Sequence, residues 1–159
     1  MSARWYAVVD GAADDGLWPL LQRCDDRACL ISGAVHPVLA PAAPYLVALD
    51  DDEPLLGAWR EHGAGRHWGI LCEAELPLAE LRQQLRQFFQ AKLPDGTIAQ
   101  FRFYDPRVFA RYLPEAPPEQ QVRWFAGVTQ FAVEGEDGRQ HSFRWRGGRL
   151  HDGDAPVAA

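Results

Sequence analysis

Two arginines, a tyrosine and a carboxylate occur together in residues 101–109, whose sequence is FRFYDPRVF. Such a group is costly to bury without hydrogen-bonding or charged partners, and it is useful as an exposed recognition patch. Large aromatic and arginine side chains also act as anchors in protein interfaces. The candidate partner-binding residues are Trp68, Arg102, Tyr104, Asp105 and Arg107.

Each candidate also has a purely structural interpretation. Arg102 and Arg107 can form an internal ion-pair network with Asp105 and Asp10 that fixes the fold. We favour this network, because patterned charges at strand ends often serve the architecture. For Trp68, burial in the core is likewise the favoured interpretation.

Catalytic motifs are missing from the sequence, so we expect no catalytic residue, no cofactor and no enzyme activity. Cys72 follows His67 by five positions, which would place the two side chains on opposite faces of a strand. Ser32 and Ser142 lie outside any Gly-x-Ser-x-Gly motif. A small hydrolase with a spatially assembled site remains an alternative, because such sites come together only in the fold.

Metal binding is not expected either. Cys24 and Cys29 have no second ligand pair with zinc spacing. The acidic run 50–53 could hold a metal, but it has no partner histidine or spaced acidic motif. We favour a role for these carboxylates at the positive end of a helix that starts at Pro54.

The composition is that of an acidic globular chain. Its 159 residues are 47% hydrophobic and 24% charged, with a formal net charge of −6, and this length suffices for one domain with a real core. A net negative chain repels phosphate backbones, so we expect no nucleic-acid partner. Three cysteines without a regular framework favour a reducing compartment, and early acidic residues argue against a signal peptide. We therefore expect a cytoplasmic protein.

An uncharged run over 28–49 is long enough to span a membrane. It contains Pro37, Pro41 and Pro44, which are unfavourable in a spanning helix. We therefore expect two buried strands around a proline-rich connector, and no membrane insertion.

Hydrophobic periodicity predicts strands that alternate with helices. The clearest helix is marked by Leu78, Leu81, Leu85 and Phe88, at spacings of three and four. Asp105 can cap the helix that starts at Pro106. The expected elements are strands over 4–10, 28–32, 44–49, 67–72 and 97–104, helices starting near 14, 54, 77, 106 and 119, and a β-hairpin over 128–146.

This pattern predicts an α/β (α+β) fold with a central mixed β-sheet, flanked by helices and followed by a C-terminal β-hairpin. A proline-rich break near residue 113 divides the expected organisation. We predict an α/β lobe over 1–113, a small helix and hairpin packed on it over 114–150, and a flexible tail over 151–159.

Five stretches together resemble the type VI secretion effector chaperones, also called adaptor proteins. They are WYAVVDGA (5–12), APYLVAL (43–49), GRHWGIL (65–71), LRQQLRQFFQAKLPDG (81–96) and FRFYDPRVF (101–109). The last stretch is the most specific of the five. The resemblance covers roughly residues 4 to 134 of the chain.

The resemblance implies a non-catalytic role in the bacterial cytoplasm. A protein of this kind binds a toxic effector and helps to load it onto its cognate VgrG spike protein, so the expected partners are an effector and VgrG. An immunity protein that neutralises a toxin is the main alternative, because an acidic surface suits a basic toxin.

Overall fold

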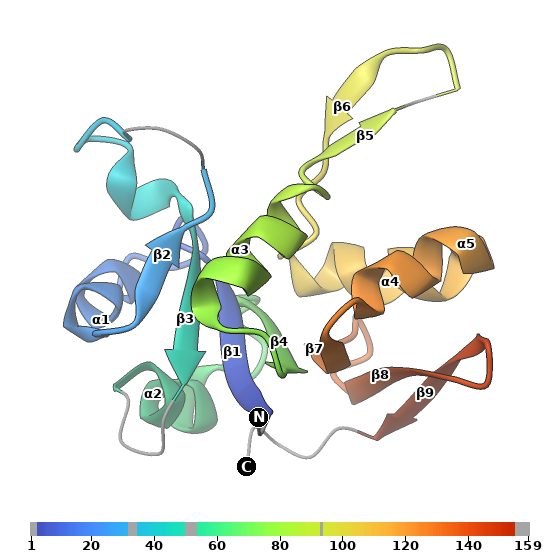
Figure 1. The fold of residues 1–159 in the computed structure, drawn as a ribbon. Helices are drawn as coiled ribbons and strands as arrows, with labels where there is room; N and C mark the ends of the chain where they lie inside the picture. The colour runs from blue at the N-terminus through green and yellow to red at the C-terminus, as the bar shows by residue number, and fades with distance from the viewer. Residues whose placement is uncertain (1–2, 32–34, 50–53, 93, 155–159) are drawn as a thin grey trace.

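The computed structural model describes residues 3–31, 35–49, 54–92 and 94–154 (Figure 1). Within these residues, seven strands form one sheet in the order β2-β3-β1-β4-β7-β8-β9, and β5 pairs with β6 in a separate hairpin. The strands are β1 Arg4–Asp10, β2 Arg27–Cys29, β3 Pro44–Leu49, β4 Gly69–Ala74, β5 Gln90–Lys92, β6 Ile98–Gln100, β7 Val128–Glu134, β8 Gln140–Arg146 and β9 Arg149–Asp154. The α-helices are α1 Leu17–Arg23, α2 Pro54–His62, α3 Leu78–Arg86, α4 Pro106–Glu115 and α5 Pro118–Gln121, and short 3-10 helices occupy Ala40–Ala42 and Val122–Phe125.

The expected α/β (α+β) class is confirmed, with a central sheet, flanking helices and β7–β8 as a C-terminal hairpin. All strand pairs in the described residues are antiparallel, whereas we expected a mixed sheet. The strand β1 lies between β3 and β4 and runs against both of them. The order of strands and helices in the sequence does not give the relative directions of the strands. Here β2 lies between β1 and β3 in the sequence and runs antiparallel to β3.

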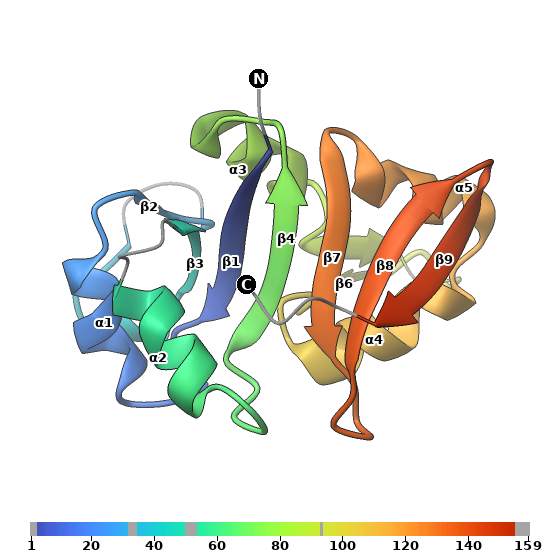
Figure 2. The same cartoon turned by 90° about the horizontal axis from the view of Figure 1, so that it is seen from below.

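The strand β1 is buried on both faces, which explains its nearly continuous apolar sequence. Tyr6 and Val8 pack into one core cluster and Ala7 and Val9 into the other, because successive side chains of a strand point to opposite faces. Helices α3 and α4 cover the first face, whereas α1 and α2 cover the second face over β2, β3 and β1 (Figures 1 and 2).

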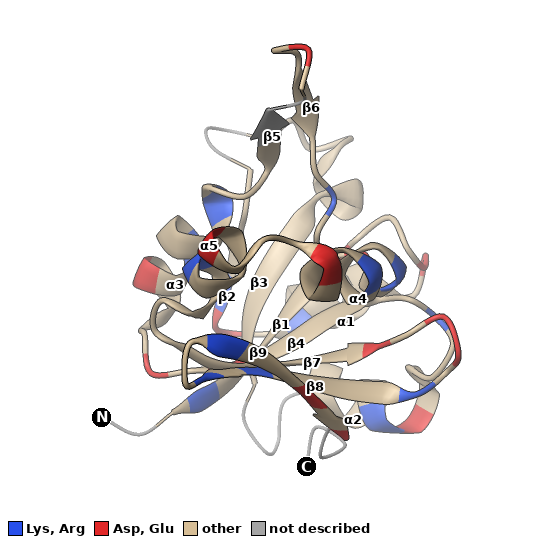
Figure 3. Ribbon diagram, turned by 90° about the vertical axis from the view of Figure 1, so that its right-hand side faces the viewer, with Lys and Arg blue, Asp and Glu red and all other residues tan. Residues whose placement is uncertain are grey.

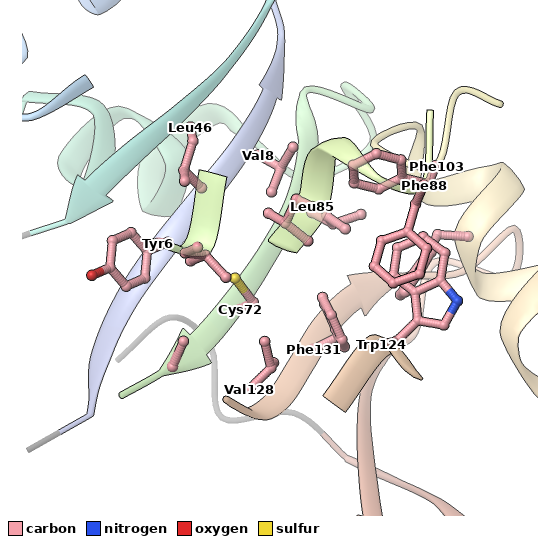
Figure 4. Packing of buried hydrophobic residues seen from close by; sticks show 14 of the residues in the cluster. Tyr6, Val8, Leu46, Cys72, Leu85, Phe88, Phe103, Trp124, Val128 and Phe131 are labelled. Atoms are coloured by element: carbon pink, nitrogen blue, oxygen red, sulfur yellow. The ribbon is translucent and has the colours of Figure 1, made fainter. Parts of the chain in front are cut away.

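Aromatic rings fill the core on the α3–α4 side of the sheet (Figure 4). Phe88 stacks on Trp124 with ring centroids 3.7 Å apart, and Phe103 lies 5.2 Å from the same tryptophan. Both Phe103 and Trp124 are almost fully buried. This packing fixes the segment that leads into α4, and with it the candidate residues on either side of Phe103.

The strand predicted over 97–104 is much shorter than expected. It comprises only Ile98–Gln100, and the chain turns before α4, where the N–H of Asp105 donates to the carbonyl oxygen of Arg102. Burial of Phe103 in the aromatic core draws this segment away from a strand partner. Arg102 is exposed and Phe103 is buried, and this difference results from core packing outside any strand.

The C-terminal part differs from the expected tail. Residues 151–154 belong to β9, which pairs with β8 across the turn at Gly147 and Gly148, and residues 155–159 lie outside the described residues. The division at residue 113 stays a prediction, although β4 and β7 join both parts in one sheet.

The proline-containing run over 28–49 includes the end of β2 and all of β3, and its tyrosine and leucine side chains in β3 are buried. The described helices are all too short or too polar to cross a bilayer. The acidic run at 50–53 lies outside the described residues, so both interpretations of it stay predictions.

Candidate functional site

Helix α4 begins with an ion pair that is also its cap. The Asp105 carboxylate accepts the backbone N–H of Arg107 at 3.0 Å, as expected for an N-cap residue. The Arg107 guanidinium donates to both carboxylate oxygens, at 3.0 Å from Nε and 2.9 Å from Nη2. Burial alone would raise the pKa of Asp105, but these hydrogen bonds and the nearby positive charges hold that pKa below its ordinary value.

Arg102 forms the second ion pair, with a residue far away in the sequence. Its Nη2 donates to Oδ2 of Asp10 at 2.6 Å, and Oδ1 of Asp10 accepts the N–H of Ala12. The Asp10 side chain is 9% exposed, whereas that of Arg102 is 56% exposed. Arg102 therefore ties the chain before α4 to the end of β1 and still presents part of its guanidinium to solvent.

Tyr104 lies beside this second pair. The guanidinium of Arg102 is 5.7 Å from the centroid of its ring, within the range of a cation–π contact. Burial raises the pKa of Tyr104 above its ordinary value, although the charge of Arg102 acts in the opposite direction. Burial acts to lower the pKa of Arg102, but Asp10 and Tyr104 together raise it. Arg102 is therefore a cation, and Tyr104 a neutral phenol, at ordinary pH.

The structure places Trp68 in the core, as the favoured structural interpretation expected. It is 5% exposed and packs edge-to-face on Trp59, with ring centroids 5.7 Å apart. Its Nε1–H donates to Oδ2 of Asp14, which also accepts from Arg66. Trp68 thus joins the loop after β1 to the start of β4 and offers little surface to a partner.

Two ion pairs therefore support the internal network that we favoured for Arg102 and Arg107, with Asp10 and Asp105 as the acidic members. The two pairs share no hydrogen bond, since Arg102 donates to Asp10 and Arg107 donates to Asp105. Both arginine side chains remain about half exposed. An architectural role is shown by these contacts, and a partner-binding role stays a prediction.

Tyr104 also lines a groove that was not predicted from the sequence. It lies between the β5–β6 hairpin and the end of β2, and its volume is about 550 Å³. In Figure 1 this hairpin projects from the body of the molecule beyond α3. The residues that line the groove are Leu30, Ile31, Pro44, Arg86, Gln87, Phe89, Gln90, Ile98, Gln100 and Tyr104.

Exposed apolar side chains mark the two walls of this groove. Ile98 on β6 is 64% exposed, and Ile31 after β2 is 43% exposed. Arg82 stabilises the second wall by donating to the carbonyl oxygens of Cys29 and Ile31. Only Ile98, directly after the turn at 94–97, could have indicated an exposed apolar position in the sequence. The opposite wall of the groove is formed by Ile31, which is 67 positions away.

The lining of the groove is mainly apolar and amide in character. The described residues that line it include no cysteine, histidine, serine or carboxylate. Cys72 lies away from it in the core, where burial raises the pKa of its thiol to about 12. The groove instead offers aliphatic and aromatic surface, amide side chains and one guanidinium, which is the usual composition of a protein-binding surface.

Comparisons with known proteins give one family. Residues 5–123 match the sequence profile of a family described as a domain of unknown function (DUF4123). No curated protein and no solved structure matches the chain.

Proposed function

Because this chain belongs to the DUF4123 family and carries an open groove of protein-binding character, we propose that it is an adaptor for type VI secretion. In this proposal it binds an effector protein in the bacterial cytoplasm and helps to load that effector onto its cognate VgrG spike. The protein acts by binding, with no chemical step of its own.

The observation that carries the proposal is the groove between the β5–β6 hairpin and the end of β2. An effector segment with exposed apolar side chains would aggregate before loading, and Ile31, Phe89 and Ile98 offer it a complementary surface. A two-stranded hairpin has little stability of its own. Docking of an effector segment would therefore stabilise the projecting hairpin as well as the effector.

Tyr104 and the neighbouring Arg102 suit the rim of such an interface. Tyr104 lines the groove, and the half-exposed guanidinium of Arg102 lies 5.7 Å from the centroid of its ring. Polar groups beside an apolar lining fit the usual arrangement of an apolar centre and a polar rim. In the proposal Arg102, Tyr104, Asp105 and Arg107 orient the partner, and the apolar lining supplies most of the affinity.

The sequence resemblance supports the same assignment. The five stretches that resemble effector chaperones lie between residues 5 and 109, all of them within the matched residues 5–123. Three of them contribute directly to the groove. Pro44 belongs to the second stretch, Tyr104 to the fifth, and four lining residues to the fourth, namely Arg86, Gln87, Phe89 and Gln90.

The test is co-purification of the tagged chain with the effector and the VgrG protein encoded beside it. We expect both proteins to be retained, and deletion of the chain to stop secretion of that effector while other effectors are still secreted. Rescue of cells poisoned by the effector, with secretion unaffected by the deletion, would instead identify an immunity protein. Retention of neither protein would overturn the proposal.

A further inference from the structure

A second surface lies on the open face of β8 and β9. Phe143 of β8 packs into the core and Trp145 stacks on Phe125, so both point toward the helices. Alternation then directs Arg144 and Arg146 to the opposite face. In the β8–β9 ladder Arg144 is paired with His151 and Arg146 with Arg149. We call these four residues, Arg144, Arg146, Arg149 and His151, the basic strip.

The positive charges of the basic strip have no carboxylate partner among the described residues. Arg144 donates to Oγ of Ser142 at 3.4 Å, and His151 contacts the carbonyl oxygen of Arg146 at 3.1 Å. The aspartates of β9 are engaged elsewhere, Asp152 with His141 and Asp154 with Arg139.

A carboxylate does occur farther along this face, on β4. Glu73 accepts a hydrogen bond from Gln130 of β7, which in turn accepts one from Ser142. Polar groups therefore connect the strands up to β8, and the arginines beyond them lack a counter-charge in the described chain. Three arginines this close together repel one another.

The basic strip is accessible to solvent and lies next to the edge of the sheet that β9 forms. Arg146, Arg149 and His151 are exposed. The described helices near β8 and β9 lie on the other face (Figures 1 and 2), and Figure 3 shows basic residues at the start of β9 and acidic ones near its end. In the described residues β9 is the edge strand, so its outer backbone groups have no strand partner.

We propose that the basic strip and the edge of β9 bind an acidic, extended segment of a partner protein, which adds to the sheet as one more strand. Backbone hydrogen bonds to β9 supply the alignment, and carboxylates on every second residue face Arg146, Arg149 and His151. This inference does not depend on the adaptor role or on the groove.

The geometry favours a peptide over a nucleic acid. Alternate residues of a strand lie about 6.6–6.8 Å apart on one face, and the basic strip follows this repeat along β8 and β9. A free strand edge is of use only to a ligand with peptide groups.

The test is an NMR titration of the ¹⁵N-labelled full chain with three synthetic peptides, each about six residues long, which is the length of a typical strand. The first alternates Glu and Thr, the second alternates Lys and Thr, and the third has the composition of the first with its Glu and Thr residues in two blocks. We expect the first peptide to shift the amide resonances of β8 and β9. Its affinity should fall as the salt concentration is raised, because salt screens exposed charges. The Lys peptide should shift none of them.

Charge reversal supplies the matched comparison. The double variant Arg146→Glu with Arg149→Glu should bind the Glu–Thr peptide at least about tenfold more weakly, whereas Arg23→Glu, an exposed arginine on α1, should bind it as the parent chain does. Amide spectra of both variants establish that they are folded. The inference is overturned if the block peptide binds as well as the alternating one, if a DNA duplex binds more tightly at the same salt, or if the shifts fall outside β8 and β9.

Discussion

The side chain of Asp105 has two roles. It caps α4, and it accepts hydrogen bonds from Nε and Nη2 of Arg107. Asp10 likewise ends β1 and receives Arg102. The two acids differ in the span of their contacts, because Arg107 follows Asp105 by two positions whereas Arg102 follows Asp10 by 92. Loss of the long-range pair should therefore affect the fold more than loss of the local one.

Alanine substitution of the two arginines tests this difference. Arg107→Ala should lower the free energy of unfolding by less than about 1 kcal/mol, because the pair is local and half exposed. Arg102→Ala should cost about 1–2 kcal/mol, because Asp10 then keeps only the N–H of Ala12. Thermal unfolding should show a loss of about 2–4 °C per kcal/mol for a chain of this size. A larger loss for Arg107→Ala would contradict the assignment.

The pH dependence of stability should reveal the Asp105 pair. The folded-state pKa of Asp105 is lowered, so the pair stabilises the fold above the unfolded pKa of an aspartate, about 4, and this contribution is lost as the pH falls through the folded-state value. Asp105→Asn keeps a capping side chain but removes the charge. We expect urea unfolding to show that this variant is less stable than the parent chain at pH 6, and that the difference shrinks as the pH falls below about 4. A difference that does not change with pH would show that the charge of Asp105 contributes nothing.

At the scale of elements, close contact between β1 and β4 depends on a glycine. A Cβ atom at Gly69 would overlap the carbonyl oxygen of Val8 in the neighbouring strand. This contact brings β4 against the end of β1, where the N–H of Asp10 donates to the carbonyl oxygen of Trp68. The same strand end carries the carboxylate that holds Arg102.

Gly69→Ala should therefore destabilise the fold by at least about 3 kcal/mol, because the backbone oxygen of Val8 cannot move without breaking the ladder. Gly57→Ala is the matched control, since its added methyl group meets nothing within 4 Å in α2. Helix propensity predicts that this control gains about 0.5–1 kcal/mol. Chemical denaturation of both variants compares them directly, and equal stabilities would contradict the contact.

Elements with a strong local pattern were predictable from the sequence. The apolar stripe of Leu78, Leu81 and Leu85 correctly gave α3, and Asp105 followed by Pro106 correctly gave the start of α4. The short strands β5 and β9 were not predicted. The sequence of β5 is only QAK and β9 ends in DGD, so neither has enough apolar residues to show a strand pattern. Their pairing depends on contacts that no local window contains.

The candidate site was predictable only in part, for a similar reason. The residue types at 102–107 indicated ion pairs, and the proposed acidic partners Asp10 and Asp105 are the observed ones. The groove was not predictable, because it forms only when β6 and the end of β2 approach each other. The three cysteines are free thiols, of which Cys24 and Cys72 are buried and Cys29 is half-buried.

At the scale of the whole molecule, the two proposed surfaces lie on opposite sides of the sheet. The groove is on the side of α3 and the β5–β6 hairpin, whereas the basic strip is on the face of β8 and β9 that the described helices leave open (Figure 1). In the proposed adaptor role the protein would hold cargo and meet a spike protein, and two separated surfaces would allow both contacts at once.

The affinity of the effector for a groove variant tests the central claim most directly. Ile98→Asp places a charge in the groove at a residue that is 64% exposed, so stability should change by less than about 0.5 kcal/mol while effector binding weakens at least tenfold. Val122→Asp, at an apolar residue outside the groove that is 42% exposed, should bind the effector as the parent chain does. Titration calorimetry with the purified effector gives both values. Unchanged affinity for Ile98→Asp would contradict the claim that this protein holds its partner in the groove.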